Sequence, residues 1–150
     1  RWDGAELREL IEEELAPYIP RRSNAAHRVT LSGPQVKLKP LTAQSITLIL
    51  HELITNALKH GSLSNDVGQL AIDWQVDAPG PDQRLALRWV ETGGPAITAP
   101  GKSNFGLSLI EITARDQLHG SIESIWNSSG LTVELSIPVG ELFRPASAKG

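Results

Sequence analysis

One stretch of about twenty residues constrains the fold more than any other: an amphipathic segment that runs from Leu41 to His60. Its apolar side chains recur at the i, i+3, i+4, i+7 spacing of a single helix face, which predicts a long helix packed on a core. Thr42 is its expected N-cap, and Gly61 is expected to end it as a C′ glycine. The apolar set is Ile46, Ile49, Leu50, Leu53, Ile54, Ala57 and Leu58.

The opposite side of this predicted helix gathers four polar side chains. Asn56 lies roughly 40° round the helix from Glu52. Lys59 lies about 20° on the other side of Glu52, and His60 lies about 80° round. Lys59 and His60 suit the negative end of the helix dipole, and Glu52 suits a solvated surface, so each has an ordinary structural explanation. Asn56 is a poor helix former in mid-helix, and its amide oxygen beside a carboxylate and a lysine suits a Mg²⁺ ion that carries phosphates.

Composition bounds the class of protein. The chain has 150 residues and a net charge of −3, with both signs dispersed. This argues against nucleic-acid binding, which needs a basic patch, and against a polybasic membrane anchor. No cysteine is present, which excludes disulfides and thiolate sites. We find no signal peptide and no apolar run of about 18 residues, so we expect a cytoplasmic location without direct membrane contact. The chain begins with Arg1 and lacks methionine, so we expect a piece of a longer protein.

The remaining periodicities predict an α+β fold, with one sheet covered on one side by helices. The first two strands are joined by a Gly-Pro turn and are expected to pair as a hairpin. Asn104 is placed to cap the last helix and Gly120 to end it. Residues 1–143 are expected to form one domain, and residues 144–150 a flexible tail. The expected helices are Ala5–Leu15 and Phe105–His119, and the expected strands are His27–Leu31, Val36–Lys39, Gln69–Asp77, Arg84–Glu91, Ser121–Trp126 and Leu131–Pro138.

A second group of candidate residues follows the strand that ends at Glu91. The next residues include Gly93 and Gly94, and glycines beside a strand-end acid let a ligand approach the backbone closely. Residues 92–104 are rich in glycine, proline and small polar side chains, and loops of this length are often functional lids. Phe105 and Gly106 then open a helix whose free N–H groups point toward whatever the lid covers, and helix N-termini bind phosphate.

The lid also fits a loose phosphate-binding loop pattern at Ala96–Ser103. Three features speak against a P-loop NTPase. Pro100 has no N–H to offer a phosphate, and Ala96 stands where the pattern has its first glycine. The helix is also expected to begin after the Lys102-Ser103 pair, whereas the pattern requires it to begin at that pair.

These residues together resemble the ATP-binding catalytic domain of bacterial sensor histidine kinases, in the GHKL (Bergerat-fold) superfamily, and more narrowly its HWE group. The markers of that group are a histidine in the asparagine-containing helix motif, here His51, and a W-x-E motif, here Trp89 with Glu91. The resemblance implies a two-layer α/β sandwich in which about three helices cover one face of a mixed sheet, with residues 95–104 as a short ATP lid. It runs from about Trp2 to Pro138 and includes Phe105–Ile110, Leu118–Gly120, Gly130–Leu131 and Ile137–Pro138.

The resemblance also implies a role for each candidate residue. Asn56 would coordinate the Mg²⁺ that bridges the ATP phosphates, and Glu52 would polarise or deprotonate the attacking group. Lys59 and His60 would contact phosphate oxygens. Glu91 would accept a hydrogen bond from the adenine amine and disfavour the carbonyl of guanine. The other nucleotide-binding positions would be Gly93, Gly94, Phe105, Gly106 and Leu107.

Three departures from the family pattern stand out. Asn104 replaces the usual glycine before the last helix, and Leu131 replaces a threonine that often contacts adenine through water. The third is that no phosphoacceptor segment is recognised, since His27 lacks the downstream asparagine and residue 31 is Leu31. The phosphoacceptor and sensor domains would therefore lie outside this chain, which would bind ATP without phosphorylating itself.

In the whole protein, the γ-phosphoryl group of ATP would pass to a histidine on the adjoining domain and then to an aspartate of a response-regulator receiver domain. Two alternatives stay open. The chain could belong to a GHKL serine kinase, or it could be a regulatory module that binds nucleotide without transferring phosphate.

Overall fold

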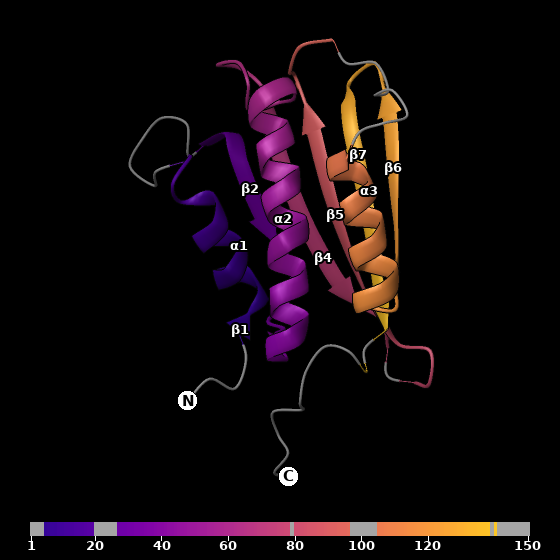
Figure 1. Ribbon diagram of the computed structural model, residues 1–150. Helices are drawn as coiled ribbons and strands as arrows, with labels where there is room; N and C mark the ends of the chain where they lie inside the picture. The colour runs from indigo at the N-terminus through magenta and orange to yellow at the C-terminus, as the bar shows by residue number, and fades with distance from the viewer. Residues whose placement is uncertain (1–4, 20–26, 79, 97–104, 139, 141–150) are drawn as a thin grey trace.

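The computed structural model describes residues 5–19, 27–78, 80–96, 105–138 and 140, and for residues 105–108 it describes the backbone alone. The fold has two layers. Helices α1 (Leu7–Leu15), α2 (Pro40–His60) and α3 (Phe105–Ile112) lie side by side on one face of a five-stranded sheet (Figure 1). The predicted α+β sandwich is confirmed.

The sheet is mixed and has the order β2-β4-β5-β7-β6. Strand β2 (Val29–Ser32) pairs in parallel with β4 (Gln69–Val76). The antiparallel neighbours that follow are β5 (Arg84–Thr92), β7 (Gly130–Pro138) and β6 (Ser121–Asn127). Strand side chains alternate between the two faces, and on β5 the alternation buries Leu85, Leu87, Trp89 and Glu91. Trp89 and Glu91 therefore belong to the face that the helices cover.

The apolar stripe predicted for the long helix forms the centre of the core, where Ile46, Leu50, Leu53 and other members of the set are buried. The helix begins at Pro40, with Lys39 at the N-cap position. The expectation that Thr42 caps it is therefore wrong. Proline at the first helical position needs no N–H partner and already has a helical φ, whereas Thr42 is buried in the first turn.

The predicted N-terminal hairpin is also wrong. Strand β3 (Lys37–Leu38) pairs with β1 (Ala5–Glu6), which was expected to be the first turn of a helix, and β2 pairs with β4 instead. Trp74 on β4 contributes to this arrangement, because its Nε1 donates a hydrogen bond to the carbonyl of Pro34 at 2.7 Å and holds the connection between β2 and β3 over the sheet. A strand pattern shows which face of a strand is apolar, but it does not show which strand lies beside it.

Helix α3 begins at Phe105, as predicted, and continues as a π-helical segment, η2 (Thr113–Gln117). The helix was expected to end at Gly120, but the residue with left-handed backbone is His119, with a φ of 54°. Gly120 is required for a different reason. A side chain there would collide with the backbone carbonyl of Ser136 on β7.

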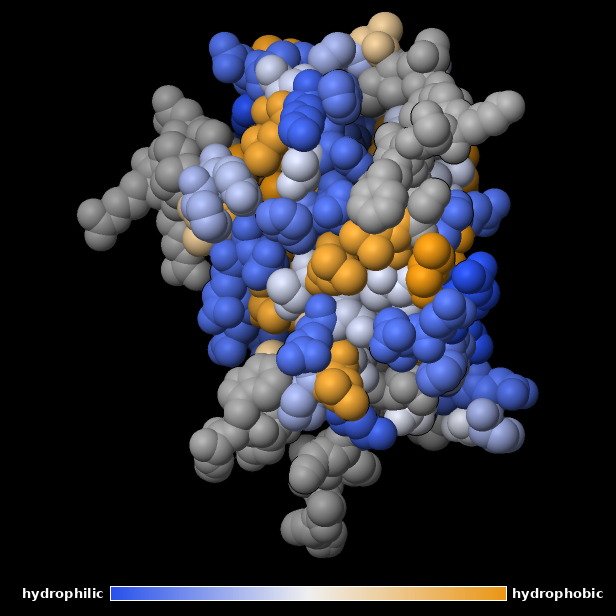
Figure 2. Space-filling view, viewed as in Figure 1, coloured by the Kyte–Doolittle hydropathy of each residue, from blue (hydrophilic) through white to orange (hydrophobic). Residues whose placement is uncertain are grey.

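The outer face of the helix layer carries apolar side chains among polar ones (Figure 2). Among the side chains that the structure describes on α2 and α3, the exposed large apolar ones are Leu41, Leu48 and Ile112. Among the described residues, none of the helices combines the length and the apolar character that crossing a bilayer requires.

Candidate functional site

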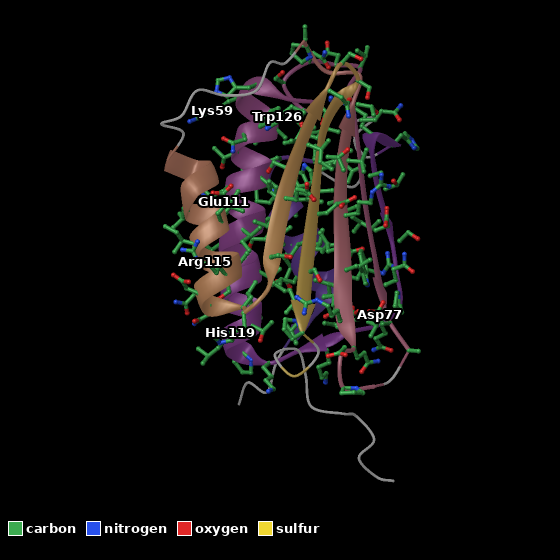
Figure 3. The ribbon with its side chains drawn as sticks, turned by 90° about the vertical axis from the view of Figure 1, so that its right-hand side faces the viewer. Lys59, Asp77, Glu111, Arg115, His119 and Trp126 are labelled. Carbon is green, nitrogen blue, oxygen red and sulfur yellow. The ribbon has the colours of Figure 1, made fainter. Side chains whose placement is uncertain are left out.

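The ends of three secondary-structure elements carry predicted site residues and lie toward one end of the molecule. They are the end of α2 at His60, the end of β5 at Thr92 and the start of α3 at Phe105 (Figure 1). Figure 3 shows Lys59 at this end and Asp77 and His119 at the opposite end. The lid expected over this corner lies partly outside the described residues, since residues 97–104 and the predicted cap Asn104 are not among them.

Glu91 connects the end of β5 to the end of α2. Its side chain is 3% exposed, and both of its oxygens accept hydrogen bonds. Trp89 Nε1 donates to Oε2 at 2.7 Å, and the backbone N–H of Ser62 donates to Oε1 at 3.0 Å. Residues two apart on a strand share a face, so the W-x-E spacing places an indole donor beside a buried carboxylate. These donors stabilise a charge that would be costly to bury without partners.

Glycines allow the backbone to close around this carboxylate. A side chain at Gly61 would collide with Glu91 Oε1, and a Cβ at Gly94 would lie 2.8–2.9 Å from the backbone of Gly61 and Ser62. Gly61 has a φ of −112°, so it is not the left-handed C′ glycine that was expected. Gly93 does have left-handed backbone, with a φ of +74°. Gly93 and Gly94 thus have structural roles, and the room they would give a nucleotide stays a prediction.

Arg28 is a residue of this corner that the sequence did not indicate. Its Nε donates to the carbonyl of Gly68 at 2.7 Å, and its Nη2 donates to the carbonyls of Ser62 at 2.7 Å and Asn65 at 2.6 Å. Arg28 therefore fixes the loop that follows α2. The partners lie 34 to 40 residues along the chain, and no local pattern connects them.

The loop is further ordered by Asn65. Its Oδ1 accepts hydrogen bonds from the backbone N–H groups of Val67 and Gly68, and its Nδ2 donates to the carbonyl of Gly93 at 3.3 Å. The loop after α2 is thereby connected to the glycines after β5. The loop after α2 and the glycine segment after β5 therefore hold each other in place beside Glu91.

The polar face of α2 differs from this bonded corner. Glu52 and Asn56 are half-buried, whereas His51, Lys59 and His60 are exposed. None of these five side chains makes a hydrogen bond or an ion pair with another residue that the structure describes. Their donors and acceptors are therefore available to a ligand on the described side of the site. Of the positions at the start of α3, Phe105, Gly106 and Leu107, only the backbone is described, and it is helical as predicted.

Among the described residues, the corner carries the buried carboxylate of Glu91 and cationic side chains at Arg28 and Lys59. Within the part of the chain that the structure describes, the pKa that clearly departs from its ordinary value belongs to another region. Arg115 donates a hydrogen bond to Asp116 at 2.9 Å, and this bond together with the negative charge of Asp116 raises the pKa of Arg115 on the exposed π-helical turn. Arg115 stays cationic in any case, so this shift adds nothing to the chemistry of the corner.

No family model matches this chain. In sequence it is similar to a blue-light-activated histidine kinase from Brucella anthropi, with 32% identity over 138 residues, which make up 92% of this chain and 28% of that protein. It is also 32% identical over 137 residues to a blue-light-activated histidine kinase from Rhizobium johnstonii, of which it covers 37%. The chain thus spans 28 to 37% of the length of these relatives.

In fold the chain is similar to solved histidine-kinase structures. One is the catalytic domain of the histidine kinase ThkA, with a TM-score of 0.59 and 18% identity over 91% of this chain and 97% of that one. Another is the histidine kinase domain of a blue-light-activated histidine kinase from Erythrobacter litoralis, with a TM-score of 0.58 and 20% identity over 75% of this chain and 52% of that one. Relatives in sequence and neighbours in fold agree: the chain is similar in sequence to histidine kinases, and it has the fold of a histidine-kinase catalytic domain.

Proposed function

We propose that this chain is the ATP-binding catalytic domain of a sensor histidine kinase of the HWE group. In the whole protein it transfers the γ-phosphoryl group of ATP to a histidine on an adjoining domain. The observation that carries this proposal is the corner itself. There the end of α2, whose polar side chains have no partner among the described residues, is joined through the backbone of Ser62 to the buried carboxylate of Glu91.

The side chains on α2 suit magnesium and phosphate. Mg²⁺ takes one or two protein oxygens and fills its other positions with water and phosphate, and the half-buried amide of Asn56 offers such an oxygen without a competing partner among the described residues. Bound Mg²⁺ would neutralise negative charge on the phosphates. Glu52 lies one helical turn before Asn56 and can orient or deprotonate the attacking group. Lys59 and His60, exposed at the end of α2, can contact phosphate oxygens.

Glu91 suits the adenine base. Each of its oxygens accepts one hydrogen bond from the protein and keeps acceptor capacity, so the carboxylate can also accept from the adenine amine. A guanine base would place its carbonyl against the carboxylate, which leaves two acceptors facing each other. The rigid hydrogen bonds to Trp89 and Ser62 would hold the carboxylate in place before the base arrives.

We place the acceptor histidine and the sensor outside the 138 residues matched in the relatives. The chain alone would then bind ATP without phosphorylating itself. The phosphoryl group would pass from the histidine to a response-regulator receiver domain, as in two-component phosphorelays. Because the proposed substrate is ATP, we also propose that the domain works in the cytoplasm.

Calorimetric titration with Mg-ATP tests the proposal. Asn56→Ala should weaken binding at least tenfold, because it removes the proposed magnesium ligand. Gln44→Ala is the matched control, since Gln44 is an exposed polar residue near the other end of the same helix, and it should bind as the wild type does. Equal affinity of the wild type and Asn56→Ala would contradict the site. A P-loop site predicts the reverse, with binding abolished by Lys102→Ala and unaffected by Asn56→Ala.

Phosphoryl transfer is tested with a supplied acceptor fragment and labelled ATP. A histidine kinase yields an acid-labile phosphohistidine, and a serine kinase yields an acid-stable phosphoserine. A module that only binds nucleotide transfers no label to the acceptor fragment. The three remaining functional classes are therefore distinguished in one experiment.

A further inference from the structure

Ser62 has a side chain whose hydrogen bonding is incomplete. The residue is 1% exposed, and within the described part of the chain its Oγ is the buried side-chain atom that has no hydrogen-bond partner. Its backbone is fully used, because its N–H donates to Glu91 and its carbonyl accepts from Arg28. A buried hydroxyl without a partner is unfavourable, so its presence in a native protein calls for an explanation.

The backbone of Ser62 is fixed on two sides. A Cβ at Gly94 would lie 2.8 Å from the Ser62 Cα, and a side chain at Gly68 would collide with the Ser62 carbonyl. The backbone of Ser62 therefore has little room to move and bring the hydroxyl to a distant partner. Its amide already lies on the Glu91 carboxylate, and the side chain of serine is short, so the hydroxyl stays in the neighbourhood of that carboxylate.

We propose that the hydroxyl of Ser62 is a base-reading group, which donates a hydrogen bond to N1 of adenine while Glu91 accepts from the neighbouring amine. This inference rests on the proposed function. The adenine edge presents a donor beside an acceptor, and Glu91 can pair with the donor alone. Guanine presents a carbonyl where adenine has its amine, so Glu91 disfavours guanine, whereas the Ser62 hydroxyl adds affinity at the N1 position.

The assignment explains why serine occupies this position at a cost to the free protein. A purely structural serine would bond to a neighbouring carbonyl or carboxylate. Removing the Ser62 hydroxyl should therefore leave the nucleotide-free domain as stable or make it more stable, and should weaken nucleotide binding at the same time. These opposite signs separate base reading from a structural role.

The experiment compares Ser62→Ala with the wild type in the intact chain. Unfolding in urea without nucleotide should show equal or greater stability of the variant. Titration with Mg-ATP should show affinity lower by about five- to fiftyfold. Wild type should lose a similar factor when 1-deaza-ATP, which has a C–H in place of N1, replaces ATP. Ser62→Ala should bind both nucleotides nearly equally, because the hydrogen bond is already missing.

Ser64→Ala is the matched control. Its hydroxyl belongs to the same loop but already donates to the carbonyl of Gly61 at 2.7 Å. This variant should lose some stability and keep the wild-type ratio between ATP and 1-deaza-ATP. Three results would overturn the inference. One is a Ser62→Ala variant that keeps the wild-type ratio with unchanged stability. Another is the same ratio with reduced stability, which would show that the hydroxyl binds an internal water. The third is wild-type protein that does not bind Mg-ATP, and this result alone also contradicts the proposed function.

Discussion

The indole of Trp89 donates a hydrogen bond to the carboxylate of Glu91, two residues further along the same strand. The other carboxylate oxygen accepts a hydrogen bond from the backbone N–H of Ser62, which lies just beyond the end of α2. One buried side chain thus connects the strand to the helix that carries the candidate magnesium and phosphate ligands. A substitution at Glu91 should therefore lower the stability of the folded domain.

Replacing Glu91 by glutamine should reduce the free energy of unfolding by about 1–3 kcal/mol. Two N–H donors point at this side chain, and an amide offers one acceptor oxygen, so one donor would face an NH₂ group. Urea unfolding measures the effect. The control is Glu134→Gln, whose carboxylate is 48% exposed and 3.5 Å from Arg88 in an exposed ion pair that contributes about 0–1 kcal/mol. Similar losses in the two variants would contradict the role given to the buried pair.

Gly61→Ala should destabilise the domain by about 1–3 kcal/mol through overpacking, because the added methyl group collides with Glu91 Oε1. The φ of −112° at Gly61 is negative, so no left-handed strain adds to this collision. Gly80→Ala is the control, since nothing lies within 4 Å of a Cβ there. Thermal unfolding of the two variants should differ by several degrees. An unchanged midpoint for Gly61→Ala would mean that Glu91 moves away without cost.

The features that local spacing could predict are those that repeat along one element. The period of the apolar residues in α2 predicted its length and its buried face, and the alternation on β5 predicted which residues share a face with Trp89. The grouping of Glu52, Asn56 and Lys59 on one helix surface is a consequence of the same period. Their individual roles stay predictions.

The features that the sequence could not predict depend on contacts between distant segments. Arg28 bonds to carbonyls 34 to 40 residues away, and these acceptors are backbone atoms that any residue could supply. The pairing of β1 with β3 likewise joins two-residue strands too short to show a period. Ser62 was missed because a missing partner is visible only when all neighbours are placed.

Arg28→Ala should lower the free energy of unfolding by about 2 kcal/mol or more, because three carbonyls lose a charged donor. Amide hydrogen exchange should become faster at Val67 and Gly68, because their N–H groups donate to the side chain of Asn65 in the loop that Arg28 fixes. Arg88→Ala removes an arginine whose 3.5 Å ion pair is about half exposed, and should cost less than about 1 kcal/mol. If exchange in the loop is unchanged in Arg28→Ala, the loop is ordered without the arginine.

His119→Gly should stabilise the domain by about 0.5–1 kcal/mol. His119 has a φ of 54°, a left-handed conformation that costs energy for a residue with a Cβ and suits glycine at the end of a helix. The gain should be partial, because glycine also has more conformational entropy to lose on folding. The neighbouring change Gly120→Ala should act in the opposite direction, because its methyl group collides with the carbonyl of Ser136. Urea unfolding of both variants tests the pair. A stabilising Gly120→Ala would contradict the collision with Ser136, and a destabilising His119→Gly would contradict the strain assigned to His119.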